Sequence, residues 1–120
     1  MDIFIPNKLV QYDCTVREIE SLIKEKFTVD VSLPNINLDF KTGTLGTADK
    51  PLVMWEDYQI LVNNNIQVVD TESSAIALVC KLNHIDFLVV RGISDFPTKE
   101  ILTDNQKAVD DQYNTFVNNI

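Results

Sequence analysis

The stretch from Ile66 to Val90, IQVVDTESSAIALVCKLNHIDFLVV, decides the expected fold. Ile66–Asp70 is short and rich in β-branched residues, which predicts a strand. Ser73–Leu82 carries apolar residues around most of its circumference, which predicts a buried helix. A turn at Asn83-His84 leads into Ile85–Val90, which is almost continuously apolar, as in strands covered on both faces. This order predicts a three-layer α/β/α domain with parallel strands.

Five further elements are expected outside this stretch. They are a strand over Asp2–Ile5, a helix following the capping box at Thr15–Glu18, a long strand over Ile36–Leu45, a short helix over Trp55–Leu61 and an amphipathic helix from Thr98 to Ile120. Ile36, Leu38 and Phe40 are expected to point inward from the long strand. Gly43 and Gly46 are expected to form bends in it.

Composition excludes several classes of protein. The 120 residues, 45% hydrophobic, suit one domain or a large part of one. Ten basic against 18 acidic residues give a net charge of −8, which disfavours nucleic-acid and membrane-surface partners. No apolar run is long enough to span a bilayer, and no signal-peptide core is present. Cys14 and Cys80 therefore indicate reduced thiols in a cytoplasmic protein, and we expect no metal and no cofactor.

Polar residues follow two of the predicted strands. In open α/β sheets ligands bind beyond the carboxyl ends of the strands, which selects Asp70-Thr71-Glu72 and Gly92-Ile93-Ser94-Asp95. Partial desolvation would raise the pKa of Asp95 and make it a proton donor near neutral pH. Glu72, at a helix N-terminus, would stay ionised and accept hydrogen bonds from vicinal hydroxyls. A proton donor beside a hydroxyl-binding carboxylate suits cleavage of a glycosidic bond.

A purely structural interpretation of the same residues is also open. Asp70 and Glu72 are residue types that cap helices or occupy their first turn. Ser94 and Asp95 form a second possible capping pair. Spacing alone leaves these alternatives undecided.

Two longer motifs resemble the nucleoside phosphorylase superfamily, with methylthioadenosine/S-adenosylhomocysteine nucleosidase as the nearest branch. Val69–Ala77 (VDTESSAIA) is similar to the Glu-Met-Glu segment and Ala-Ile-Ala helix of that family. Phe87–Asp95 (FLVVRGISD) is similar to its Val-Val-Arg-x-Ile-Ser-Asp strand end. Asp2–Ile5, followed by Gln11–Asp13, resembles an earlier strand of the family. The resemblance covers nearly the whole chain but only the C-terminal half of the family domain, so it implies a phosphorylase-like mixed sheet flanked by helices, with residues 1–120 forming a partial domain.

The resemblance also implies roles for individual residues. Asp95 matches the general acid that protonates the purine at N7, and Ser94 lies beside it near the base. Glu72 matches the carboxylate that binds the ribose 2′ and 3′ hydroxyls. Arg91 matches an arginine that supports the catalytic aspartate. Asp49 belongs to Thr47–Pro51, which falls where the family has a loop covering the base.

The chain departs from the family pattern within the expected substrate site. Thr71 replaces a methionine under the ribose, and Asp70 replaces a glutamate. Pro51 stands where an aromatic side chain would stack on the purine, unless Trp55 or Phe96 substitutes for it. The family's water-activating or phosphate-binding residues belong to an N-terminal half that this chain lacks.

The sequence predicts cleavage of the N-glycosidic bond of an adenosine-type purine nucleoside. Water is favoured over phosphate as the acceptor because few basic residues are present to bind phosphate. The alternative is a non-catalytic nucleoside-binding or oligomerisation remnant of the same fold. A half-domain would leave an apolar face and a sheet edge uncovered, so we expect a homo-oligomer or a complementing N-terminal half as partner.

Overall fold

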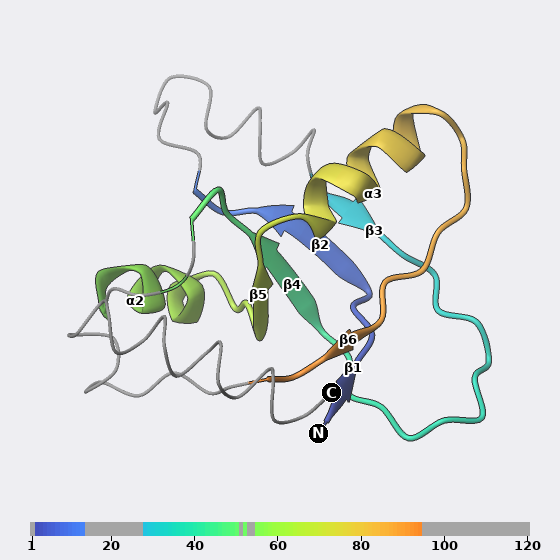
Figure 1. Cartoon of the computed structure of the whole chain (residues 1–120), viewed down its shortest axis with the longest axis horizontal. Helices are drawn as coiled ribbons and strands as arrows, with labels where there is room; N and C mark the ends of the chain where they lie inside the picture. The colour runs from blue at the N-terminus through green and yellow to red at the C-terminus, as the bar shows by residue number, and fades with distance from the viewer. Residues whose placement is uncertain (1, 14–27, 51, 53–54, 95–120) are drawn as a thin grey trace.

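The computed structural model describes residues 2–13, 28–50, 52 and 55–94. Within these residues the elements, in chain order, are β1 (Ile3–Phe4), β2 (Lys8–Gln11), β3 (Val29–Asp30), β4 (Thr44–Thr47), α2 (Trp55–Asn63), β5 (Val68–Asp70), α3 (Ser73–Leu82) and β6 (Arg91–Gly92) (Figure 1). The helices predicted after Thr15–Glu18 and from Thr98 to Ile120 lie outside the described residues, as does Asp95.

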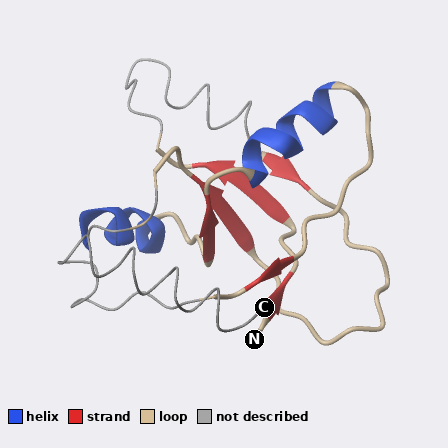
Figure 2. Ribbon diagram, viewed as in Figure 1, coloured by secondary structure: helices blue, strands red, loops and turns tan. Residues whose placement is uncertain are grey.

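The described strands form a mixed sheet and a separate strand pair (Figure 2). The four-stranded sheet has the order β3-β2-β4-β5. β2, β4 and β5 run parallel, and β3 joins the edge of β2 antiparallel. β1 pairs antiparallel with β6. The expected mixed sheet of a phosphorylase-like α/β fold is confirmed.

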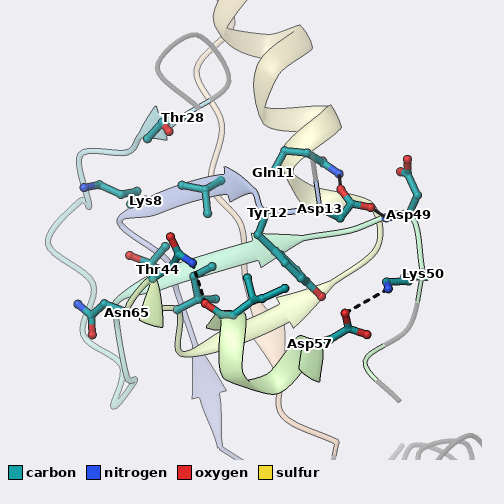
Figure 3. A pocket seen from close by; sticks show the side chains of 14 residues that line it. Lys8, Gln11, Tyr12, Asp13, Thr28, Thr44, Asp49, Lys50, Asp57 and Asn65 are labelled. Atoms are coloured by element: carbon teal, nitrogen blue, oxygen red, sulfur yellow. Dashed lines mark hydrogen bonds and ion pairs between the residues drawn. The ribbon is translucent and has the colours of Figure 1, made fainter. Parts of the chain in front are cut away.

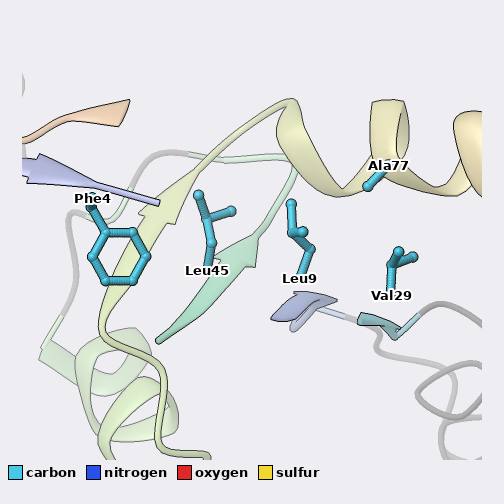
Figure 4. Packing of buried hydrophobic residues seen from close by; sticks show 5 residues of the cluster. All are labelled: Phe4, Leu9, Val29, Leu45 and Ala77. Carbon is cyan, nitrogen blue, oxygen red and sulfur yellow. The ribbon is translucent and has the colours of Figure 1, made fainter. Parts of the chain in front are cut away.

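One face of the four-stranded sheet packs against α3. Leu9 of β2 and Leu45 of β4 are fully buried and lie next to each other in the parallel register. They form a cluster with Phe4, Val29 and Ala77, the last of which comes from α3 (Figure 4). Each large aliphatic side chain buried in this way contributes about 1.5–3 kcal/mol, so this cluster holds α3 on the sheet.

The opposite face of the sheet packs against α2. Val10, Tyr12 and Val69 contact a cluster formed by Leu52, Leu61 and Ile66. Figure 4 shows α3 and α2 on opposite sides of the strands. Side chains alternate between the two faces along a strand, so Leu9 points to one helix and Val10 to the other. The expected three-layer arrangement is therefore present in the described part of the chain.

Several predicted elements are confirmed. The helix predicted over Ser73–Leu82 has those bounds, and the predicted helix from Trp55 runs to Asn63. The strand predicted over Ile66–Asp70 is β5, Val68–Asp70. The turn at Asn83-His84 is also present: His84 has a φ of 55°, and Ile85 N donates to Cys80 O at 2.9 Å.

The strand predicted over Ile85–Val90 is wrong. This segment belongs to no strand, and β6 begins only at Arg91. Phe87 and Val89 pack against the α3-side core, whereas Leu88 and Val90 are exposed. The apolar composition of a segment indicates that it tends to be extended and buried. A strand also needs the edge of a neighbouring strand with which to form hydrogen bonds.

The predicted burial of α3 is wrong as well. Ala77 is buried, but Ile76, Val79 and Leu82 are 59%, 58% and 68% exposed. Only one side of the helix meets the sheet, because a helix lying on a sheet buries a single stripe. The residues on its other side are left uncovered among the described residues.

The long strand predicted over Ile36–Leu45 is replaced by a loop and a shorter strand. The chain from Ile36 to Phe40 is not in a strand, and Leu38 is 46% exposed rather than inward. β4 begins at Thr44, so Gly46 lies inside a strand and is not a bend. A Cβ at Gly46 would come within 2.8 Å of Tyr12 Cδ1 and 2.9 Å of Ile66 Cγ2. Glycine is therefore required there for close packing on the α2 face.

No sequence pattern predicted β2, which lies between β3 and β4 inside the sheet. Its four residues, Lys8–Gln11, have polar ends and are too short to establish a period. Within the described residues, no helix has the length and apolar content needed to cross a membrane.

Candidate functional site

The carboxyl ends of the three parallel strands meet at one edge of the sheet. Asp13 lies two residues after β2, Asp49 lies two residues after β4, and Asp70 ends β5. Main-chain bonds join these ends: Tyr12 N donates to Thr47 O at 3.0 Å, and Ala48 N donates to Asp70 O at 3.2 Å. This is the edge at which open α/β sheets bind ligands.

Asp70 is the centre of a buried polar network at this edge. Its side chain is only 2% exposed, and its Oδ2 lies 3.4 Å from Arg91 Nη2. Asp70 Oδ1 accepts hydrogen bonds from Thr47 Oγ1 at 2.8 Å and from Ser73 N at 3.2 Å. The Ser73 hydroxyl donates to Oδ2. The network therefore ties β4, β5, the start of α3 and β6 together.

The first amides of α3 are satisfied by this network and not by Glu72. Ser73 N donates to Asp70, and Ser74 N donates to Thr47 Oγ1 at 3.0 Å. Glu72 stands at the N-cap position of α3 but makes no side-chain capping bond. It is exposed, and its carboxylate accepts a hydrogen bond from the neighbouring hydroxyl of Thr71. Asp70 therefore supplies a side-chain cap for α3, whereas Glu72 occupies the N-cap position without a side-chain capping bond.

The loop after β4 is held by carboxylates from two other elements (Figure 3). Asp49 N donates to Asp13 Oδ2 at 2.7 Å, and Gln11 Nε2 donates to Asp13 Oδ1. Lys50 Nζ lies 3.1 Å from Asp57 Oδ1 in the first turn of α2. Sequence reasoning missed both Asp13 and Asp57. The resemblance included Asp13 within Gln11–Asp13 but implied no role for it, and the strand that precedes it was missed.

A pocket of about 1030 Å³ opens on the α2 side of the sheet. We call it the α2-side pocket; it is lined by Lys8, Val10, Gln11, Tyr12, Asp13, Thr28, Thr44, Asp49, Lys50, Asp57, Ile60, Asn64, Asn65 and Ile66. Tyr12 directly follows β2, and its ring extends toward Asp57 (Figure 3). Burial, together with the carboxylates of Asp57, Asp13 and Asp70, raises the pKa of Tyr12 to about 12. Of the predicted site residues in the described ranges, only Asp49 lines this pocket.

The two predicted polar clusters are joined through Arg91. The guanidinium of Arg91 pairs with Asp70, and the support of Asp95 that the resemblance implied for Arg91 stays a prediction. Ser94 is half-buried and follows β6, and Ile93 N donates to Asp2 O at 2.9 Å. Because Asp95 lies outside the described residues, its position relative to Glu72 stays a prediction.

Trp55 belongs to the packing of α2. Its ring lies 5.1 Å from that of Tyr58 and contacts the cluster around Leu61. This matches the role of a core aromatic and leaves the ring engaged within the α2 face. In the ranges 2–13, 28–50, 52 and 55–94, no group of three or more His, Cys, Asp or Glu residues is arranged to hold a metal ion.

A scan against protein-family models matches residues 2–120 to the phosphorylase superfamily. This chain belongs to the phosphorylase superfamily. A search of curated protein sequences found no match. The superfamily assignment therefore rests on the family match and agrees with the parallel strands and flanking helices described above.

Solved structures with the phosphorylase-superfamily fold are similar to this chain. A mutant of the Helicobacter pylori methylthioadenosine nucleosidase, with 5′-methylthioadenosine in its active site, has a TM-score of 0.69 at 16% identity, covering 98% of this chain and 61% of that one. An Arabidopsis thaliana 5′-methylthioadenosine nucleosidase has a TM-score of 0.66 at 24% identity, covering 98% and 52%. The futalosine hydrolase of H. pylori has a TM-score of 0.64 at 17% identity, covering 99% and 60%. This chain thus spans 52–61% of the length of these three proteins.

Proposed function

We propose that this protein cleaves the N-glycosidic bond of a purine nucleoside of the adenosine type. The observation that carries the proposal is that the Glu72 side chain is exposed and makes no capping bond to α3. Its carboxylate is exposed at the start of α3, while Asp70 and Thr47 take over the capping of that helix. An exposed carboxylate at the ligand-binding edge, which accepts a hydrogen bond from the adjacent Thr71 hydroxyl, suits the recognition of two vicinal ribose hydroxyls.

In the proposed reaction the bond between the anomeric carbon and the purine nitrogen breaks, and its electron pair goes to the base. Asp95 donates a proton to the purine at N7, and Ser94 lies beside the base. Glu72 accepts hydrogen bonds from the ribose hydroxyls, with Thr71 under the sugar. Water attacks the anomeric carbon and loses a proton; phosphate is the other possible acceptor. Proton donation of this kind contributes about 10²–10⁴-fold to a rate.

Asp70 and Arg91 act in this proposal by positioning other groups. The Asp70 side chain is 2% exposed and accepts three hydrogen bonds besides its contact with Arg91, which leaves little of it for a substrate. Beside its expected place among the substrate-binding residues, Asp70 is therefore proposed to hold the Thr71-Glu72 segment in position. Asp49 stands in the loop proposed to cover the base, where its main chain is already bonded to Asp13.

A second candidate function is a non-catalytic nucleoside-binding member of the superfamily. The observation that favours it is the departure of the chain from the family pattern at Thr71 and Pro51, both within the expected substrate site. The exposed apolar residues of α3 then suit a homo-oligomer or a complementing N-terminal half.

The deciding experiment measures adenine release from 5′-methylthioadenosine. The 120-residue chain is assayed alone and mixed with the N-terminal part of a nucleosidase relative, beside Asp95→Asn and the control Asp86→Asn, an exposed carboxylate. We expect Asp95→Asn to lose about 10²-fold or more of the rate and the control to keep it. Binding of the nucleoside without adenine release, both by the chain alone and in the mixture, would favour the non-catalytic function.

A further inference from the structure

The loop at residues 47–50 is fixed at four successive positions. β2 and β5 hold its start through the main-chain bonds at Thr47 and Ala48. Asp49 N and Lys50 Nζ are then held by the carboxylates of Asp13 and Asp57, at 2.7 and 3.1 Å. Neither the sequence motifs nor the family resemblance assigned a role to these two carboxylates.

Asp13 is oriented to receive the Asp49 amide. Its Oδ1 is already engaged by Gln11 of β2, which directs Oδ2 across the strand ends toward the loop. The two residues are 36 positions apart in the chain, so this contact exists only in the folded protein. A hydrogen bond from an amide to a charged carboxylate is stronger than one between neutral groups.

Asp57 provides the second attachment from the other side of the loop. Its side chain is 13% exposed, and its Oδ2 is buried with no hydrogen-bond partner among the described residues. Two features therefore offset the burial of this charge: the Lys50 ammonium next to Oδ1 and the N-terminal end of α2. Breaking the Lys50 contact would leave a buried carboxylate without a counter-charge.

We propose that Asp13 and Asp57 are positioning residues that preset the 47–50 loop for the nucleobase. The inference rests on the proposed function, in which this loop covers the base. A loop that is already ordered loses less conformational freedom on binding, so these carboxylates raise affinity for the base half of the nucleoside. The ribose half is bound by Glu72 on a different element and does not depend on them.

Hydrogen–deuterium exchange tests the attachment itself on the full chain without any ligand. Asp13→Ala should speed exchange of the Asp49 amide by about tenfold, since it removes a charge-assisted hydrogen bond. Asp13→Asn, which keeps the side-chain size, guards against a variant that fails to fold. Asp39→Ala, an exposed carboxylate on another loop, should leave the Asp49 amide unchanged. Equal exchange in Asp13→Ala and the unaltered chain would overturn the proposal.

Binding of the two halves of the substrate separates positioning from general destabilisation. In Asp13→Ala and Asp57→Asn we expect adenine to bind about tenfold more weakly and methylthioribose to bind as before. Glu72→Gln should show the reverse pattern. Weakening of both ligands by Asp13→Ala, or of neither, would contradict a positioning role for Asp13. If the unaltered chain binds neither ligand, the proposed function fails. The attachment of the 47–50 loop by Asp13 is tested separately: it is refuted if the Asp49 amide exchanges at the same rate in Asp13→Ala as in the unaltered chain.

Discussion

At the scale of single residues, Asp70 is the group on which the strand ends depend most. Replacing it with Ala leaves the hydroxyls of Thr47 and Ser73 and the amide of Ser73 without their acceptor. We expect Asp70→Ala to lower the free energy of unfolding by about 2–4 kcal/mol, since each unsatisfied buried donor costs about 1–3 kcal/mol. Urea denaturation measures this loss. Glu72→Ala, which removes an exposed side chain with no capping bond, should stay within about 0.5 kcal/mol.

The half-buried phenol of Tyr12 makes the free energy of unfolding depend on pH above 10. Its pKa in the folded chain is raised from 10.0 to about 12 by burial and by the carboxylates of Asp57, Asp13 and Asp70. The folded chain thus holds this proton more tightly than the unfolded chain does. The resulting stability is fully present below pH 10 and is lost as the pH rises toward 12. Tyr12→Phe should flatten the decline in unfolding free energy across pH 10–12, and an unchanged decline would contradict the assignment.

At the scale of elements, the packing of β4 against the α2 face depends on Gly46. A Cβ there would lie 2.8 Å from Tyr12 Cδ1 and 2.9 Å from Ile66 Cγ2, so one of these side chains would have to move. We expect Gly46→Ala to cost about 1–3 kcal/mol of unfolding free energy, as overpacked cores do. In a double-mutant cycle, Ile66→Ala should partly relieve that cost. Strictly additive effects would show that the two positions are not in contact.

Elements differ in how far the sequence predicts them. α3 was predicted to the residue because its apolar positions extend over ten residues between a polar turn and Asn83-His84. Ile85–Val90 was misassigned because apolar β-branched residues do not reveal whether a strand edge is available. The place of Glu72 at the start of α3 was predicted from local motifs. The roles proposed for Asp13 and Asp57 could not be predicted from the sequence, because each depends on a contact that only the tertiary fold creates.

At the scale of the whole molecule, the outer side of α3 and the segment after it form an apolar face. Ile76, Val79 and Ile85 are each more than half exposed, and such a face favours association in water. We expect the chain to self-associate at high concentration in sedimentation velocity, and Val79→Lys to reduce that association. Ile60→Lys on α2, 42% exposed in the unaltered chain, is the matched control. The prediction would be contradicted if the unaltered chain stayed monomeric at high concentration.

The most direct test of the account is a crystal structure of the Asp95→Asn variant with 5′-methylthioadenosine. We predict both ribose hydroxyls within about 3.2 Å of the Glu72 carboxylate, and the base between residue 95 and the 47–50 loop. A nucleoside bound with both ribose hydroxyls away from the Glu72 carboxylate would contradict the proposed function.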